Sequence, residues 1–177
     1  LAFHLGCRAG ELVITSGATE ANNLALAGVF EAEMVRSRPR TKILVSSIEH
    51  PSVLETAEAL RARGAVGDEI EVDASGRLNL ADFHSKLTQD TLLVSVMAAN
   101  NEVGTLQPIS HVADACRQAG AYCHTDATQW LGRIPLRLAE WGVDLLSASA
   151  HKLHGPKGVG LLYVRTGISL SEQQHGG

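Results

Sequence analysis

The sequence lacks the features by which several large classes of protein are recognised. No apolar run approaches the roughly 20 residues that a membrane-spanning helix needs, and no signal peptide opens the chain. Basic charge is not in excess, because 15 lysine and arginine residues stand against 19 aspartate and glutamate residues, for a net charge of −4. We therefore expect neither a membrane partner nor a nucleic-acid partner.

Cysteine and the common cofactor motifs are also scarce. Cys7, Cys116 and Cys123 are an odd, widely spaced set without metal-ligand spacing. Three unpaired thiols favour a reducing cytoplasm over secretion. A Rossmann fingerprint, a phosphate-binding P-loop and paired His/Cys spacing are absent as well. We expect a cytoplasmic protein that holds no metal.

The composition is that of an ordinary globular protein. Of the 177 residues, 45% are hydrophobic and 19% are charged. This length suits one domain with a single core. The chain starts at Leu1 rather than methionine and stops at residues 173–177 without a closing element. We therefore expect a fragment of a larger polypeptide, incomplete at both ends.

Short apolar strands alternate with helical patterns, which is typical of an α/β fold with a mostly parallel sheet. Strands are predicted over residues 11–15, 42–46, 69–72, 91–97, 121–125, 143–147 and 160–165. Helices are predicted from the turn at 16–20 to the break at 37–40, and over about 51–63, 79–87 and 109–118. The strand at 91–97 is the most apolar and is expected to be central. The last strand should run antiparallel, because too few residues precede it for a helical crossover.

Lys152 follows His151 directly, after an apolar strand and before a glycine-rich turn. Ligand clefts of open α/β sheets lie outside the carboxyl ends of the strands, and a lysine there can act as a Schiff-base amine. A solvated surface lysine is the commoner outcome. The lysine alone does not decide between the two.

Other polar clusters also follow predicted strands. The Gly17-Ala18-Thr19 turn opens a helix, whose free N–H groups favour a phosphate, although a plain N-cap is the alternative. His50 could stack on a ligand or be an ordinary surface histidine. Asn101 belongs to a polar stretch that either a ligand or a tight turn explains. Asp126 suits a protonated ring nitrogen or a helix N-cap.

Taken together, these groups supply a phosphate site, a stacking imidazole, an acid for a pyridinium nitrogen and an imine-forming amine. That set fits pyridoxal phosphate better than nicotinamide or metal chemistry. Five motifs carry a resemblance: Ser16-Gly-Ala-Thr-Glu-Ala-Asn-Asn-Leu24, Glu49-His50, Asn100-Asn-Glu-Val-Gly104, His124-Thr-Asp-Ala-Thr-Gln129 and Ala150-His-Lys-Leu-His-Gly-Pro-Lys-Gly158.

In this order the motifs resemble the cysteine desulfurases, which are class V, fold-type I pyridoxal-phosphate enzymes. The resemblance covers almost the whole chain and is closest to the iron–sulfur and nitrogen-fixation branch. It implies a three-layer α/β fold, with a mostly parallel mixed sheet flanked by helices. It also implies that residues 1–177 are part of the cofactor-binding large domain. The N-terminal segment, the catalytic cysteine loop and the small C-terminal domain are expected to lie outside this chain.

The resemblance assigns two catalytic residues, Lys152 and His50. Lys152 would form the internal aldimine, and His50 would stack over the pyridine ring and assist proton transfer. Asp126 would pair with the ring nitrogen, and Gln129 would bond the phenolic oxygen.

Further residues are assigned to the cofactor by the same resemblance. Thr19, Ser149 and His151 would hold the phosphate, with the backbone of Ala18 beside them. Asn101 would lie near the substrate carboxylate and the cofactor oxygen.

The activity implied is conversion of L-cysteine to L-alanine, with sulfur passing to an enzyme cysteine as a persulfide. None of the cysteines in this chain matches the family's nucleophile, so the fragment alone is expected to be inactive in sulfur transfer. A homodimer and iron–sulfur scaffold or other sulfur-acceptor proteins are implied as partners. Selenocysteine lyase, a class V aminotransferase and a non-catalytic cofactor-binding scaffold remain as alternatives.

Overall fold

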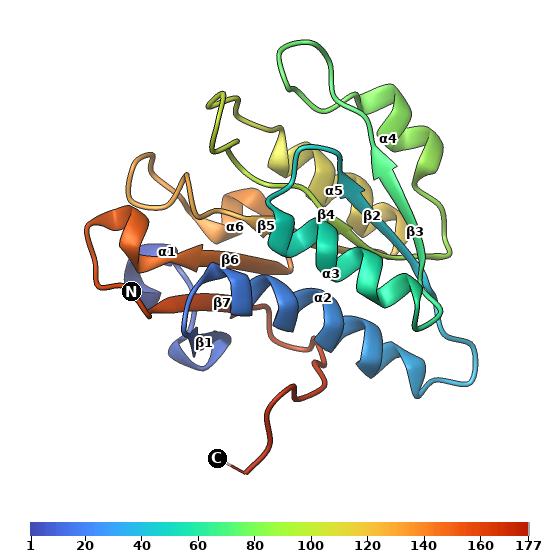
Figure 1. Ribbon diagram of the computed structural model, residues 1–177, viewed down its shortest axis with the longest axis horizontal. Helices are drawn as coiled ribbons and strands as arrows, with labels where there is room; N and C mark the ends of the chain where they lie inside the picture. The colour runs from blue at the N-terminus through green and yellow to red at the C-terminus, as the bar shows by residue number, and fades with distance from the viewer. Residues whose placement is uncertain (177) are drawn as a thin grey trace.

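The computed structural model describes residues 1–176, which form a seven-stranded sheet between two layers of helices (Figure 1). The strands are β1 (Leu12–Thr15), β2 (Lys42–Ser46), β3 (Val66–Ile70), β4 (Thr91–Ser95), β5 (Tyr122–Asp126), β6 (Leu145–Ser149) and β7 (Gly160–Val164). The α-helices are α1 (Ala2–Leu5), α2 (Ala18–Met34), α3 (Pro51–Arg61), α4 (Leu80–Lys86), α5 (Ile109–Ala119) and α6 (Leu138–Trp141). Two 3₁₀ turns, η1 (Ala9–Glu11) and η2 (Ala150–Leu153), precede β1 and follow β6.

The strand order is β1-β7-β6-β5-β4-β2-β3. Strands β2 to β6 are parallel, whereas β7 runs antiparallel to both of its neighbours, β6 and β1. The α/β class, the mostly parallel mixed sheet and the antiparallel last strand are therefore confirmed. Because β1 runs in the same direction as β6, its carboxyl end lies at the same edge of the sheet as those of the parallel strands.

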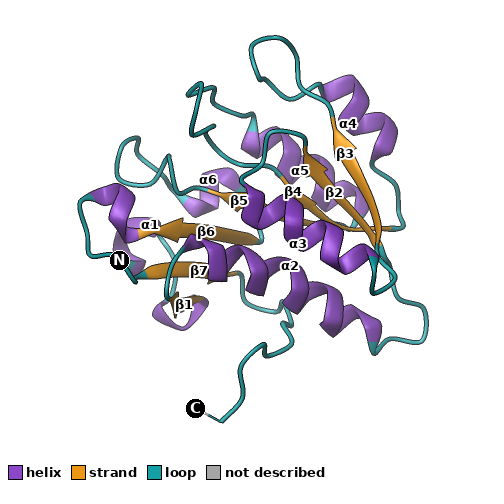
Figure 2. Cartoon of the chain, viewed as in Figure 1, coloured by secondary structure: helices purple, strands orange, loops and turns teal. Residues whose placement is uncertain are grey.

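Helices cover both faces of the sheet, as expected from the three-layer prediction (Figure 2). Helices α2 and α3 pack together on one face, where Leu26, Phe30 and Val53 are buried against strand residues. Helices α5 and α6 cover the other face. Helix α5 buries Val112 and Cys116, which stand four residues apart on the same helical stripe. Among residues 1–176, no helix is both long and apolar enough to cross a membrane.

Two strands are displaced from their predicted positions. Strand β3 covers Val66–Ile70 rather than 69–72, because it pairs along the whole of β2 through its backbone. Of its five residues only Ile70 is buried, so its side chains carried little information. Strand β6 extends to Ser149 rather than ending at Ser147. Both serines are buried within the strand, where their hydroxyls lie within hydrogen-bond distance of histidine side chains.

The strand predicted to be central, β4, is interior and has all five of its residues buried. The middle position of the sheet belongs to its neighbour β5. This difference matters for the site, because β5 ends in Asp126 and therefore carries that carboxylate to the centre of the carboxyl edge.

His154 has φ 60° and is the one non-glycine residue with positive φ in the described part of the chain. A left-handed conformation costs an L-residue with a Cβ about 1–2 kcal/mol relative to glycine. His154→Gly is therefore expected to raise the free energy of unfolding by about 1 kcal/mol in urea denaturation. Gly158→Ala, in the same loop at φ 81°, is the converse variant and should lower it by a similar amount. An unchanged or lowered stability of His154→Gly would contradict the prediction.

Candidate active site

Polar residues gather where the parallel strands end. Asp126 closes β5 and Ser149 closes β6, while His50 follows β2 and Asn101 follows β4. Thr19 lies just beyond the carboxyl end of β1. Because these strand ends share one edge of the sheet, five segments far apart in sequence meet there.

A cavity of about 430 Å³ lies at this edge. Every residue that the sequence analysis assigned to a site lines it: Ala18, Thr19, His50, Asn101, Asp126, Gln129, Ser149, His151 and Lys152. The expected gathering into one cleft is therefore found. The role of each residue within the cleft stays a prediction.

The N-terminus of α2 opens onto the cavity. Gly17 precedes the helix, and no side chain caps its first N–H groups. Glu20, in the first turn, instead accepts hydrogen bonds from the backbone N–H and the hydroxyl of Ser16. A 17-residue helix with free N–H groups and an aligned dipole favours an anion at this end. Ser149 Oγ lies beside this helix start, 3.9 Å from where a Cβ of Gly17 would be, and is 2.7 Å from His151 Nδ1.

Asp126 is 5% exposed and accepts two hydrogen bonds. The backbone N–H of Thr128 donates to Oδ1 at 2.9 Å, and Asn22 Nδ2 donates to Oδ2 at 2.8 Å. Asp126 is not a helix N-cap, because turns rather than a helix follow it. The carboxylate is thus held by neutral donors, and the side chain lines the cavity.

His50 is the N-cap of α3, with Pro51 at the first helical position. Its Nδ1 accepts the backbone N–H of Ser52 at 3.1 Å and lies 2.8 Å from the hydroxyl of Ser52. The residue is exposed and lines the cavity. The helix cap therefore engages Nδ1 of the ring, and Nε2 takes no part in capping.

Lys152 lies in η2 and is exposed, not buried at the end of a strand. Asn101 is also exposed, and Gln129 is half-buried. Lys152 is nevertheless brought to the same cavity as Asp126 and His50. Its amine is thus accessible to a ligand in the cavity.

Asn22 is a site residue that the sequence analysis missed. It is fully buried on α2 and bonds both Asp126 and the hydroxyl of Ser52. Ala25, Leu26 and Val29 lie three, four and seven residues further on and are buried on the same side of the helix. A polar amide at the head of such an apolar stripe could have identified Asn22.

Glu49 directly precedes His50 in the chain and is buried. Its Oε1 accepts hydrogen bonds from Ser46 Oγ at 2.6 Å and from the backbone N–H of Met97 at 2.5 Å. Within residues 1–176, Oε2 has no partner. Burial is the main cause that raises the pKa of this carboxyl to about 8, and the charge of Asp126 adds to it.

His124 lies two residues before Asp126 on β5 and is fully buried. Its Nδ1 is 2.8 Å from Ser95 Oγ and its Nε2 is 2.9 Å from Ser147 Oγ, so it joins three adjacent strands. Burial lowers the pKa of this imidazole to about 4, although the Asp126 charge acts in the opposite direction. The ring is therefore neutral at pH 7.

Comparison with known proteins identifies the family. Residues 3–177 match the model of the family described as aminotransferase class-V. The chain belongs to the class V aminotransferase family. A cysteine desulfurase IscS of Dictyoglomus turgidum is 42% identical over the whole chain, and a cysteine desulfurase of Bradyrhizobium diazoefficiens is 46% identical over 94% of it. The chain spans 44% and 42% of these two relatives, less than half of each.

Solved structures of the same kind superpose closely on this class V chain. A structure titled as a NifS-like protein matches 99% of the chain with a TM-score of 0.94 and 40% identity. One titled as SspA in complex with cysteine matches 99% with a TM-score of 0.93 and 34% identity. The chain covers 48% and 50% of these two structures, respectively.

None of the three cysteines of this class V chain lines the cavity. Cys116 and Cys123 are buried side by side, and contact with Cys116 together with burial raises the pKa of the Cys123 thiol well above its usual range. Burial also raises the pKa of Cys7. Thiols in such surroundings stay protonated and are poor nucleophiles.

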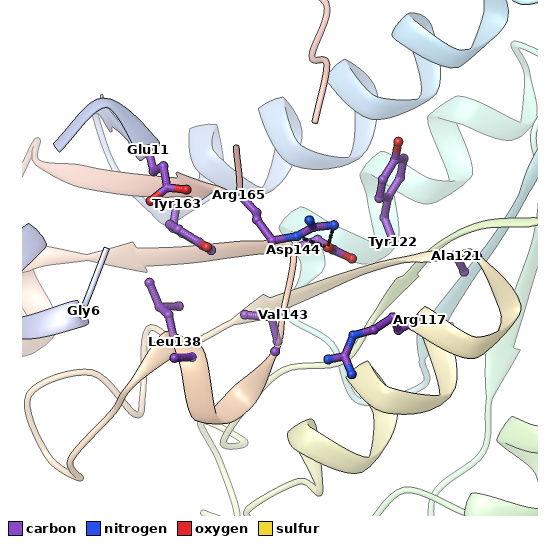
Figure 3. A pocket seen from close by; sticks show the side chains of 13 residues that line it. Gly6, Glu11, Arg117, Ala121, Tyr122, Leu138, Val143, Asp144, Tyr163 and Arg165 are labelled. Atoms are coloured by element: carbon purple, nitrogen blue, oxygen red, sulfur yellow. Dashed lines mark hydrogen bonds and ion pairs between the residues drawn. The ribbon is translucent and has the colours of Figure 1, made fainter. Parts of the chain in front are cut away.

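A second cavity, of about 530 Å³, lies at the amino end of β5 (Figure 3). Arg165 forms an ion pair there with Asp144, at 2.6 Å, while Glu11 and Tyr163 lie nearby on the same wall. None of the residues predicted for the site lines this cavity. The residues predicted for the site therefore line the cavity at the carboxyl edge and not this one.

Proposed function

We propose that residues 1–177 are the cofactor-binding large domain of a pyridoxal-phosphate-dependent cysteine desulfurase. The reaction converts L-cysteine to L-alanine, with the sulfur passing to a cysteine of the enzyme as a persulfide. One observation carries the proposal: residues from five separate motifs line a single cavity at the carboxyl edge of the sheet. The similarity to enzymes named cysteine desulfurase, at 42% and 46% identity, supports the choice of reaction.

The cavity suits the proposed cofactor in size and in polarity. Its volume of about 430 Å³ lies within the range of small-ligand sites, about 300–1,000 Å³. The uncapped N-terminus of α2 suits the phosphate, and the Asp126 carboxylate suits a protonated ring nitrogen. Thr128 lines the same cavity, and its Oγ1, among the described residues, is buried without a hydrogen-bond partner. A buried hydroxyl without a partner supports the presence of a polar ligand here.

Bound pyridoxal phosphate supplies an electron sink for the bonds that change in the substrate. In the proposed site, Lys152 would contribute the amine that attaches the cofactor covalently. Asp126 would pair with the protonated ring nitrogen, and Gln129 would bond the phenolic oxygen. His50 would lie against the ring and transfer protons to or from the substrate.

The remaining groups hold the ligand in place. Thr19, Ser149 and His151 bind the phosphate together with backbone N–H groups at Ala18. Asn101 lies near the substrate carboxylate. The sulfur acceptor is a cysteine outside this set, since no thiol of the described residues lines the cavity. A homodimer, a cytoplasmic location and sulfur-acceptor partners belong to the same proposal.

Lys152→Ala in the full-length protein that contains this chain tests the covalent attachment. The wild-type protein is expected to bind pyridoxal phosphate and to show a visible absorbance band. After borohydride reduction the cofactor should remain attached to the protein as a covalent label. Lys152→Ala should lose the band and the reducible label completely, because no other amine lies in the cavity lining. With a dithiol present to reduce the persulfide and release its outer sulfur, L-cysteine should yield alanine and sulfide with the wild-type protein only.

Lys157→Ala is the matched control, because Lys157 is an exposed lysine of the same loop and does not line the cavity. It should behave as the wild type in every measurement. Retention of the borohydride-stable label by Lys152→Ala would refute the assigned role of this lysine. Turnover of a keto acid without sulfide release would indicate the aminotransferase alternative.

A further inference from the structure

A chain of hydrogen bonds joins Asp126 to His50 through two residues with no assigned role. Asn22 Nδ2 donates to Asp126 Oδ2 at 2.8 Å and to Ser52 Oγ at 2.9 Å. Ser52 Oγ in turn lies 2.8 Å from His50 Nδ1. The chain connects the end of β5 with the starts of α2 and α3, and Asn22 in its middle is fully buried.

The direction of each bond follows from the donors and acceptors available. Asp126, as a carboxylate, only accepts, so the Asn22 amide must turn its NH₂ group towards it. The same nitrogen has a second hydrogen, which it donates to Ser52 Oγ. The opposite amide orientation would set Oδ1 against the carboxylate. The orientation of Asn22 is thus dictated by Asp126.

His50 receives the end of this chain. Because Ser52 Oγ accepts from Asn22, its own proton is free to point to His50 Nδ1. The backbone N–H of Ser52 also donates to Nδ1, at 3.1 Å. Both interactions need Nδ1 without a proton, so the neutral ring carries its proton on Nε2.

We propose that Asn22 and Ser52 are positioning residues that hold neutral His50 in the Nε2–H tautomer and tie its ring to the Asp126 carboxylate. The tautomer itself needs no cofactor. Its use in catalysis rests on the proposed function, in which His50 transfers protons and Asp126 pairs with the ring nitrogen. His50 then faces the substrate as a proton donor at Nε2. The hydrogen bonds through Ser52 and Asn22 fix its ring relative to Asp126, which pairs with the cofactor ring nitrogen in the proposed function.

The test is the tautomer ratio of His50 in the full-length protein without cofactor. Long-range ¹H–¹⁵N correlation spectra at about pH 8, above the ordinary imidazole range, report which nitrogen carries the proton. His50 is assigned by the resonance that disappears in His50→Gln. The wild-type protein should show the Nε2–H form in large excess. Ser52→Ala and Asn22→Ala should each lower the ratio of Nε2–H to Nδ1–H about threefold to tenfold, the value of one hydrogen bond.

Two further variants separate positioning from general stability. Ser52→Thr keeps the hydroxyl and should keep the wild-type ratio. Asn23→Ala removes the neighbouring amide, which is exposed and, among residues 1–176, bonds only the Thr19 carbonyl, so it should also leave the ratio unchanged. A merely structural role of Asn22 would lower stability without moving the tautomer.

The outcomes are distinct from those of the cofactor test. A dominant Nδ1–H form in the wild-type protein, or an unchanged ratio in both Ser52→Ala and Asn22→Ala, overturns the proposal even if Lys152 binds the cofactor. The predicted ratios support it even if Lys152 does not. If Asn22→Ala fails to fold, Ser52→Ala and Ser52→Thr decide the question, because both change only a half-buried side chain.

Discussion

Gly160→Ala is expected to lower the free energy of unfolding by about 3 kcal/mol and to weaken cofactor binding. A Cβ at Gly160 would lie 2.5 Å from both the Cα and the carbonyl carbon of Gly17, and 2.8 Å from its oxygen. All three are backbone atoms, which cannot turn aside as the end of a side chain can. Overpacking of this kind costs about 1–3 kcal/mol, occasionally more.

The clash falls on the part of the fold that presents the proposed phosphate site. Gly160 pairs with Thr15 on one side and with Ser149 on the other, so the strand cannot retreat without breaking one of these pairings. Relief must therefore displace Gly17, the residue that leads into α2. Displacing that turn moves the helix N–H groups that the phosphate would use.

Urea denaturation measures the loss of stability, and titration with pyridoxal phosphate measures the loss of affinity. Gly10→Ala is the matched control, because nothing lies within 4 Å of a Cβ there and its φ is not positive. Its stability should stay within about 0.5 kcal/mol of the wild type. A Gly160→Ala protein as stable as Gly10→Ala would contradict the prediction. It would show that β7 and the turn at Gly17 can move apart without loss of stability.

The contact between Gly160 and Gly17 also shows what sequence patterns can and cannot predict. The alternation of strands and helices and the polar residues after each strand are local features, so the fold class and the shared edge of the sheet could be predicted. The contact itself joins residues far apart in the chain, and only the order of strands brings them together. No local pattern distinguishes Gly160 from any glycine that opens a strand.

The same reasoning explains the other differences. The position of β3 follows its backbone pairing with β2, which leaves little trace in the sequence of an edge strand with a single buried residue. The partnership of Asn22 with Asp126 depends on α2 lying over the end of β5. The apolar stripe of α2 could have marked Asn22 as buried, but not what it bonds.

Glu49→Gln is expected to change how stability depends on pH. Burial raises the pKa of Glu49 from an ordinary 4.5 to about 8 in the folded protein, so the folded state binds a proton that the unfolded state has released. The resulting stabilisation is complete below about pH 4.5 and is lost as the pH rises through about 8. Glutamine stays neutral, and its oxygen can still accept from Ser46 Oγ and Met97 N–H.

His124 acts in the opposite direction over part of this range. Its pKa falls from an ordinary 6.5 to about 4 on folding, so its contribution is present above pH 6.5 and is lost as the pH falls through about 4. Between about pH 4.5 and 6.5 the two effects therefore offset each other. From pH 6.5 to 8 Glu49 acts alone, and at 1.36 kcal/mol per pH unit the loss is about 2 kcal/mol.

The decisive comparison is thus between urea denaturation at pH 6.5 and at pH 8. The wild-type protein should lose about 2 kcal/mol more than Glu49→Gln over this interval. Glu55→Gln changes an exposed glutamate on α3, the helix that follows Glu49, and should follow the wild type. Parallel profiles of the wild type and Glu49→Gln would mean that Glu49 is ionised in the folded protein at pH 6.5. In that event Oε2, which has no partner among residues 1–176, would carry charge in the interior, and a bound donor would be needed to explain it.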